Sequence, residues 1–217
     1  MTGNFANDEA PPADLAESLR LIQEGRAEAA RRLRPDPRLQ FWPWGVSWLI
    51  SFALFFLRFG PNGHVFVDMP AWLPGVVLGV TLFTAGMISG RSGARAYRQV
   101  TGESDRRGAM YGWSWFLAFA SMGTILSRAT EWVPDAEAGM LWSASAVAIT
   151  GVLHIAGGAI WLDRSLFRLG MWITLSNIAG VIAGPGWHSL VVCLAGGGGM
   201  LVAGTVAWRR YRTGDGE

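Results

Sequence analysis

Six apolar segments, separated by short polar ones, dominate the pattern of the chain after residue 40. Each has about 20 residues, enough for a helix to cross the ~30 Å hydrocarbon core of a bilayer. Glycines lie within these segments and tryptophans at their ends, as is typical of transmembrane helices. The pattern predicts an all-α, polytopic membrane protein. Its bundle is expected over residues 39–212, with six transmembrane helices at about 41–59, 71–90, 109–127, 138–162, 166–183 and 189–208.

The N-terminal part of the chain is polar and has a different periodicity. Residues 1–13 contain prolines and few apolar residues, which predicts a disordered tail. Asp14 and Glu17 form a helix start signal, and apolar residues such as Leu19 follow at helical spacing. We therefore expect residues 14–38 to form a short cytoplasmic amphipathic helix and a linker. This helix either docks a partner or senses lipid at the inner membrane surface, or it is a solvated anchor for the first span.

Arginine supplies all 18 basic residues, and the formal net charge is +2. Basic residues near a span are retained on the cytoplasmic side. With both termini inside, only Arg58 and Arg128 fall on the outer side. The distribution predicts a multi-pass protein of the cytoplasmic (plasma) membrane with cytoplasmic N- and C-termini, including a short tail at 213–217. The topology-determining loop contains Arg91, Arg95, Arg98, Arg106 and Arg107.

The composition excludes several classes of function. Without lysine no Schiff base can form, which excludes retinal pigments and pyridoxal phosphate chemistry. The lone Cys193 provides no paired-cysteine redox or metal motif. Serine-hydrolase, zinc-protease and phosphate-loop motifs are missing from the sequence. We expect no enzyme activity, no cofactor and no metal, and membrane topology rather than nucleic-acid binding explains the basic loop.

Pairs of glycines four residues apart occur in the second and fifth expected spans. Small residues at this spacing let helix backbones approach closely. Both packing inside the bundle and a face for a homodimer are compatible with this pattern. The residues are Gly75, Gly79, Gly86, Gly90, Gly180 and Gly184.

Polar groups at membrane depth are the candidate site residues, because ionisable side chains inside a bilayer indicate function by default. The alternative interpretation of a lone histidine such as His154 is that it has no functional role and is hydrogen-bonded within the bundle. Four successive glycines in the last span either break the helix and expose backbone groups, or pack against the second or fifth span. A haem held by two histidines would need a second inward histidine besides His154. His64 and His188 are expected in outer loops, so we expect no haem. The expected depths permit one cavity lined by His154, Thr174, Asn177, Gly196, Gly197, Gly198 and Gly199.

The stretch AESLRLIQEGRAEAARRLRPDPRLQFWPWGVSWLI, residues 16–50, carries a family resemblance. It resembles the start of uncharacterised actinobacterial six-span integral membrane proteins, in which a charged helix precedes a Trp-rich first span. The resemblance implies a membrane location and no particular activity.

The expected architecture also bears on function. A six-span body with both termini inside resembles the permease halves of ABC exporters and the substrate-binding subunits of vitamin importers. We therefore expect a small-solute transporter, or the membrane subunit of a transporter, embedded in the lipid bilayer. The alternative is a non-catalytic sensor or scaffold, which binds a cytoplasmic protein partner through the N-terminal helix and the Arg91–Arg107 loop.

Overall fold

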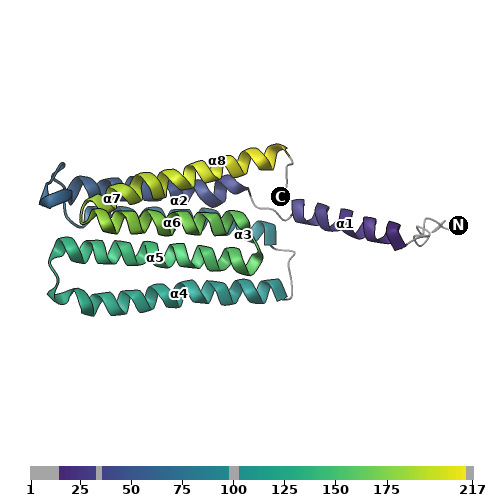
Figure 1. Ribbon diagram of the computed structural model, residues 1–217, viewed down its shortest axis with the longest axis horizontal. Coiled ribbons are helices and arrows are strands. Elements are labelled where there is room, and N and C mark those ends of the chain that lie inside the picture. The colour runs from purple at the N-terminus through teal and green to yellow at the C-terminus, as the bar shows by residue number, and fades with distance from the viewer. Residues whose placement is uncertain (1–14, 33–35, 98–102, 214–217) are drawn as a thin grey trace, which may run out of the picture.

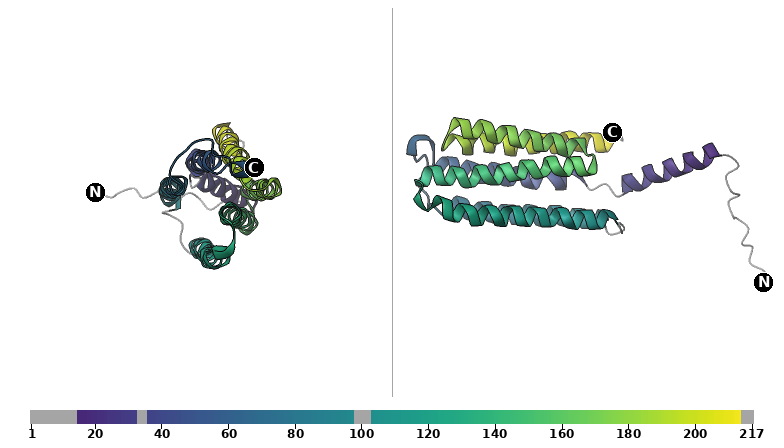
Figure 2. Two further views of the ribbon diagram at one scale, coloured as in Figure 1. Left: turned by 90° about the vertical axis from the view of Figure 1, so that its left-hand side faces the viewer. Right: turned by 60° about the horizontal axis from the view of Figure 1, so that its bottom comes forward.

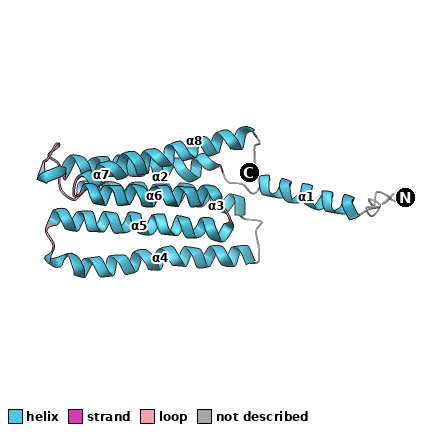
Figure 3. Cartoon of the chain, in the orientation of Figure 1, coloured by secondary structure: helices cyan, strands magenta, loops and turns pink. Residues whose placement is uncertain are grey.

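The computed structural model describes residues 15–32, 36–97 and 103–213, and these residues form helices and no strand (Figures 1 and 3). The all-α prediction is confirmed. Arg98, the expected N-terminal tail and residues 214–217 lie outside the described residues. The helices are α1 (Leu15–Arg32), α2 (Pro37–Arg58), α3 (Leu73–Tyr97), α4 (Glu103–Ala129), α5 (Asp135–Trp161), α6 (Arg164–Ala183), α7 (Trp187–Val191) and α8 (Gly198–Thr213), with short 3-10 turns at Pro61–Gly63 and Thr130–Trp132 and a π-helical turn at Val192–Gly197.

Large apolar side chains cover the outer faces of these helices, and Phe83 on α3 is 70% exposed. Such a surface is stable in hydrocarbon and unstable in water. These helices make the chain a membrane protein. Within the described residues, five segments are long and apolar enough to cross a bilayer: Pro37–Arg58, Leu73–Ala94, Asp135–Trp161, Arg164–Ala183 and Trp187–Thr213.

The helix α4 is as long as its neighbours but is not among these five segments. Residues 108–127 carry no charged side chain, yet Tyr111, Trp113 and Trp115 lower their mean hydropathy. Aromatic residues of this kind favour the membrane–water interface. The expected span at 109–127 therefore stays a prediction.

The helices of the bundle run side by side, so the bundle has two ends (Figures 1 and 2). We call the end at which α2 begins and α8 ends the proximal end, and the opposite end the distal end. The helix α3 lies against α2, and α4 lies against α5 at one side of the bundle. The helix α1 extends from the proximal end away from the bundle. Arg58 and Arg128 lie at the distal ends of α2 and α4.

Ser89 on α3 joins α3 to α2 near the proximal end. Pro43 lies inside α2 and has no N–H to donate to the carbonyl oxygen of Leu39, four residues earlier. The Ser89 hydroxyl donates to this oxygen at 2.9 Å, and the Trp44 indole Nε1 donates to the Ser89 hydroxyl at 2.9 Å. The Gln40 amide donates to the Ser89 carbonyl oxygen at 3.2 Å. A side chain of the neighbouring helix thus compensates for the internal proline.

The core lies between α2, α5, α6 and the last span. The backbones of α5 and α6 approach closely because glycines line their contact. A Cβ at Gly158 would lie 2.5 Å from the Phe167 nitrogen, and one at Gly170 would lie 2.5 Å from the Ile155 nitrogen. In a membrane, van der Waals contact of this kind drives helix association. The buried apolar side chains are Trp48, Phe52, Val147, Leu169, Ile173, Val192, Cys193 and Met200.

The glycines of α3 do not pack inside the bundle, in contrast to those of α5 and α6. No atom of a neighbouring element lies within 4 Å of the place where a Cβ would stand at Gly75, Gly79, Gly86 and Gly90. Gly180 packs against His188, and Gly184 (φ 92°) forms the turn after α6. Internal packing therefore does not explain the α3 glycines, and the homodimer face stays a prediction.

Replacing Ser89 by Ala should lower the free energy of unfolding by about 1–2 kcal/mol. The change leaves the Leu39 carbonyl and the Trp44 indole without these partners in lipid. Thermal unfolding in detergent measures the loss. Ser114→Ala is the matched control, because the exposed Ser114 hydroxyl donates within its own helix. Adding Pro43→Ala restores an N–H for Leu39 and should recover part of the stability. Wild-type stability of Ser89→Ala would contradict the assigned role.

Candidate functional site

The last span is interrupted near its start. After α6, Gly184 (φ 92°) and Gly186 (φ 81°) take backbone conformations that favour glycine, so the chain reverses in a short turn. The helix α7 begins directly after this turn, at Trp187. It continues into the π-helical turn Val192–Gly197, which precedes α8. Such π-turns are rare and are frequent at functional sites.

A chain of hydrogen bonds lies beside this interruption and joins α5, α6 and α7. His188 Nε2 lies 2.9 Å from Asn177 Oδ1, and His188 Nδ1 lies 3.2 Å from Ser143 Oγ. Asn177 Nδ2 donates to the Ala144 carbonyl oxygen at 2.9 Å. His188 is 1% exposed and Asn177 is 6% exposed, so the protein shields the pair from its surroundings.

These contacts determine which atoms donate and which accept. Because Asn177 Nδ2 donates to a carbonyl, its Oδ1 is the acceptor and His188 Nε2 carries a hydrogen. His188 Nδ1 can then accept the hydrogen of the Ser143 hydroxyl. If Nδ1 gains a proton, the Ser143 oxygen can accept it and the hydroxyl can donate to the Met140 carbonyl oxygen, 3.1 Å away. The imidazole can therefore gain and lose a proton while both its nitrogens keep partners.

The expectation that His188 lies in an outer loop is wrong. Two glycines in the turn Gly184–Gly186 let the helix restart at Trp187, one residue before His188. Gly180 also leaves room for the imidazole, since a Cβ there would lie 2.9 Å from His188 Cδ2. The sequence held a signal for this placement, because Gly-Pro-Gly makes a tight turn. His64 is exposed in the connection between α2 and α3, as expected.

The first two glycines of the four-glycine run form a packing surface. A Cβ at Gly196 would lie 2.8 Å from the Trp48 ring, and one at Gly197 would lie 2.7 Å from the Leu49 nitrogen. At these two glycines the last span therefore packs closely against α2, the first expected span. Gly198 has no neighbour within 4 Å of where its Cβ would stand.

The fourth glycine of the run faces α6, the fifth expected span. Gly199 lies against the indole of Trp172, and a Cβ there would collide with the ring. Trp172 Nε1 donates to the Ala195 carbonyl oxygen, within the π-helical turn, at 2.8 Å. The interrupted segment is thus held from two sides, by α2 and by α6.

The other predicted site residues lie apart from this hydrogen-bond chain. His154 Nδ1 lies 2.8 Å from the Thr150 carbonyl oxygen, and the His154 ring meets Trp115 of α4 edge-on at 5.4 Å. The Thr174 hydroxyl donates to the Gly170 carbonyl oxygen of its own helix at 2.9 Å. The structure gives His154 and Thr174 partners other than Asn177, and the cavity shared by the predicted residues stays a prediction. Asn177 instead bonds to His188, which was expected in an outer loop.

Two further predictions concern charged residues and metals. Arg91, Arg106 and Arg107 are exposed at the proximal end, Arg95 belongs to α3, and Arg98 lies outside the described residues. Among the residues that the structure describes, no cluster of three or more His, Cys, Asp or Glu side chains could hold a metal ion.

Comparisons of the chain with known protein families, with curated proteins and with solved structures found no match. The assignment to membrane proteins therefore depends on the apolar helices, and the choice of candidate site depends on the buried hydrogen bonds of His188 and Asn177.

Substituting His188→Phe or Asn177→Leu should each lower the free energy of unfolding by about 1–3 kcal/mol, because each leaves a buried polar partner unsatisfied. The double substitution removes both partners, so it should cost less than the sum of the two. Thermal unfolding in detergent checks both values. His64→Phe, at an exposed position, is the control and should change stability little. Fully additive losses would mean that the two side chains are not coupled.

Proposed function

We propose that this chain is a six-span protein of the cytoplasmic membrane that moves a small polar solute together with a proton, alone or as the membrane subunit of a larger transporter. One observation carries the proposal, the buried His188–Asn177 hydrogen bond beside an interrupted last span. Ionisable residues at membrane depth and broken helices are typical of solute and proton pathways. The proposal assigns no catalytic activity to the chain.

The bonding of His188 supports the proton step. Histidine is the side chain whose unperturbed charge change lies nearest to neutral pH. Rotation of the Ser143 hydroxyl is enough to accommodate a proton on Nδ1, and the Asn177 amide keeps the ring oriented. His188 is the second residue of α7, close to the distal end, so the expected outer side supplies the proton.

The interruption of the last span supports a movement that opens the site. Glycine lowers the stability of a helix, and Gly196–Gly199 occupy the end of the π-helical turn and the start of α8. The segment α7 can therefore shift relative to α8 without breaking a regular helix. A shift of this kind would expose the His188 ring to solute and to water.

The course of the chain supports α4 as the sixth span. The helix α3 ends at the proximal end and α5 begins at the distal end, so the chain must pass between the two ends along α4. The Tyr111 hydroxyl donates to the Leu153 carbonyl oxygen of α5, which fastens α4 along this path. The arginine distribution of the sequence supports a cytoplasmic proximal end.

Reporter fusions should verify six crossings with both termini inside. Fusions after residues 65, 134 and 186 should report the outer side, and fusions after residues 100 and 165 and at the C-terminus the inner side. The fusions at 100 and 134 bracket α4, and finding both on one side would remove α4 from the membrane. Two fusions on the wrong side would refute the topology.

A transport assay should separate His188 from the other intramembrane histidine. Full-length protein in liposomes that enclose a pH-sensitive dye should admit protons under an inside-negative potassium diffusion potential, with amino acids, sugars and nucleosides outside. His188→Gln should abolish this flux, because an amide cannot carry the proton. His154→Gln is the matched control and should retain it, since His154 packs against Trp115. An active His188→Gln would refute the proposal, and an inactive wild type would refute transport by the chain alone.

A second candidate function is that of a sensor or scaffold, and one observation favours it. Leu19 and Ile22 on α1 are half exposed, and α1 extends from the bundle toward the expected cytoplasm (Figure 1). An apolar helical stripe of this kind suits a protein partner. Deleting residues 1–34 discriminates between the candidates. A transporter should keep its proton flux after the deletion, whereas a scaffold should lose its cytoplasmic partner.

A further inference from the structure

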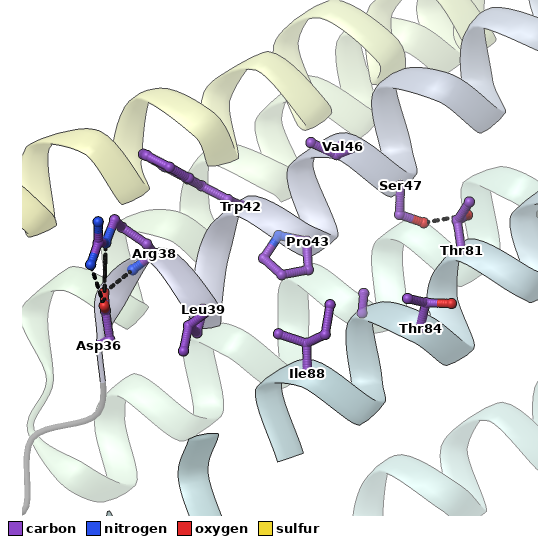
Figure 4. A pocket seen from close by; sticks show the side chains of 11 residues that line it. Asp36, Arg38, Leu39, Trp42, Pro43, Val46, Ser47, Thr81, Thr84 and Ile88 are labelled. Carbon is purple, nitrogen blue, oxygen red and sulfur yellow. Dashed lines mark hydrogen bonds and ion pairs between the residues drawn. The ribbon is translucent and has the colours of Figure 1, made fainter. Parts of the chain in front are cut away.

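A groove of about 620 Å³ lies between α2 and α3 in the proximal half of the bundle (Figure 4). This volume lies within the range of small-molecule sites. Leu39, Pro43 and Val46 line the groove on α2, and Ala85 and Ile88 line it on α3. Val46 is 44% exposed, so the groove is open on one side toward the surrounding membrane.

The hydroxyl groups in the groove already have hydrogen-bond partners. The Ser47 hydroxyl donates to Thr81 Oγ1 at 2.7 Å, and the Thr81 hydroxyl donates to the Val77 carbonyl oxygen at 2.8 Å (Figure 4). The Thr84 hydroxyl donates to the Val80 carbonyl oxygen at 2.8 Å. Hydroxyls that are engaged in this way offer little to a polar solute. The wall of the groove is therefore suited to an apolar chain.

Charged groups stand at the proximal mouth of the groove. Arg38 Nη2 lies 2.8 Å from the Asp36 carboxylate, and this hydrogen bond keeps the pKa of Asp36 below its usual value. The Arg38 and Arg212 guanidinium groups each lie 5.1 Å from the centre of the Trp208 ring. The two groups are thus at most twice that distance apart. Asp36 and Arg38 line the groove itself, and Arg212 lies near Arg38 through their shared contact with Trp208. Two guanidinium groups and one ionised carboxylate therefore give this end of the groove and its surroundings net positive charge.

The length of the groove confines it to one leaflet. From Leu39 to Ser47 it follows α2 for about 12 Å, which is less than half of the ~30 Å hydrocarbon core. Its mouth lies where α2 begins and α8 ends, which is where the expected spans place the proximal head groups. Trp42 and Trp44 lie in the same part of α2, as expected of an interfacial aromatic belt.

We propose that this groove binds one acyl chain of an anionic phospholipid from the proximal leaflet, whose phosphate contacts Arg38 and Arg212. Guanidinium groups bind phosphate through charge-assisted hydrogen bonds. The apolar wall disfavours a polar solute, and the positive mouth favours an anionic head group over a zwitterionic one. The groove lies apart from the His188 chain, so the inference goes beyond the transport proposal and does not depend on it.

Native mass spectrometry of the full-length, delipidated protein can distinguish the contribution of the lipid head group to binding from that of the acyl chain. The protein is titrated with dioleoyl phosphatidylglycerol or with dioleoyl phosphatidylcholine, which differ in the head group alone. The anionic lipid should bind about tenfold more tightly, as a charge-assisted hydrogen bond implies. Arg38→Gln combined with Arg212→Gln should remove this preference. Val46→Phe fills the groove and should weaken both lipids about tenfold.

Matched controls repeat each type of change outside the groove. Arg164→Gln alters an exposed arginine of the proximal end, and Val80→Phe alters a side chain on α3 that is 60% exposed. Neither side chain lines the groove, so both variants should bind like the wild type. Arg212→Gln alone retains the Asp36–Arg38 pair and should reduce the preference in part, which keeps the test decisive if the double variant does not fold.

The outcomes that would overturn the inference are distinct. Equal affinity of the wild type for the two lipids, or a preference that survives loss of both arginines, would refute the contact with the phosphate. Unchanged binding by folded Val46→Phe would refute the groove as the place of the acyl chain. Neither result would bear on proton flux through His188.

Discussion

Ser89 on α3 donates to the Leu39 carbonyl oxygen that Pro43 leaves without its helical partner on α2. Water cannot replace such a partner in the hydrocarbon of a bilayer, so polar groups there must be satisfied within the protein. The same demand recurs in the last span, where the Trp172 indole donates to the Ala195 carbonyl oxygen of the π-helical turn. At both places an irregular segment is held by a donor from a neighbouring helix. The irregular segments thereby join the helices of the bundle.

The need to satisfy polar groups within the protein has different results at the two ends of the bundle. Near the distal end, His188 and Asn177 satisfy one another in a buried chain that can accept a proton. In the proximal half, the Ser47 hydroxyl donates to Thr81 Oγ1 and the Thr81 hydroxyl donates to the Val77 carbonyl oxygen, so the groove beside them has an apolar wall. Polar groups that are satisfied internally thus leave a buried histidine bonded at both nitrogens at one end and an apolar groove at the other. The two places differ in the chemistry that they offer.

The partners of His154 and Asn177 show where reasoning from sequence stops. The depths expected for His154 and Asn177 permitted one cavity, and depth depends on distance along a helix of known rise. The direction in which a side chain leaves its helix depends on how that helix is rotated against its neighbours. His154 turns toward Trp115 on α4, whereas Asn177 turns toward His188 on α7. Periodicity alone does not contain this rotation, because nearly every face of these helices is apolar.

The sequence by itself determined the helical class, the positions of the apolar segments and the asymmetry of arginine. Each of these follows from the solvation of a segment in lipid or at its interface, which depends on local composition. Only the tertiary structure decided that the α3 glycines face outward, that Gly197 packs on Leu49, and that His188 enters the bundle. These features depend on contacts between residues far apart in the chain, where backbone approach and hydrogen-bond geometry select one packing among many that the same apolar pattern allows.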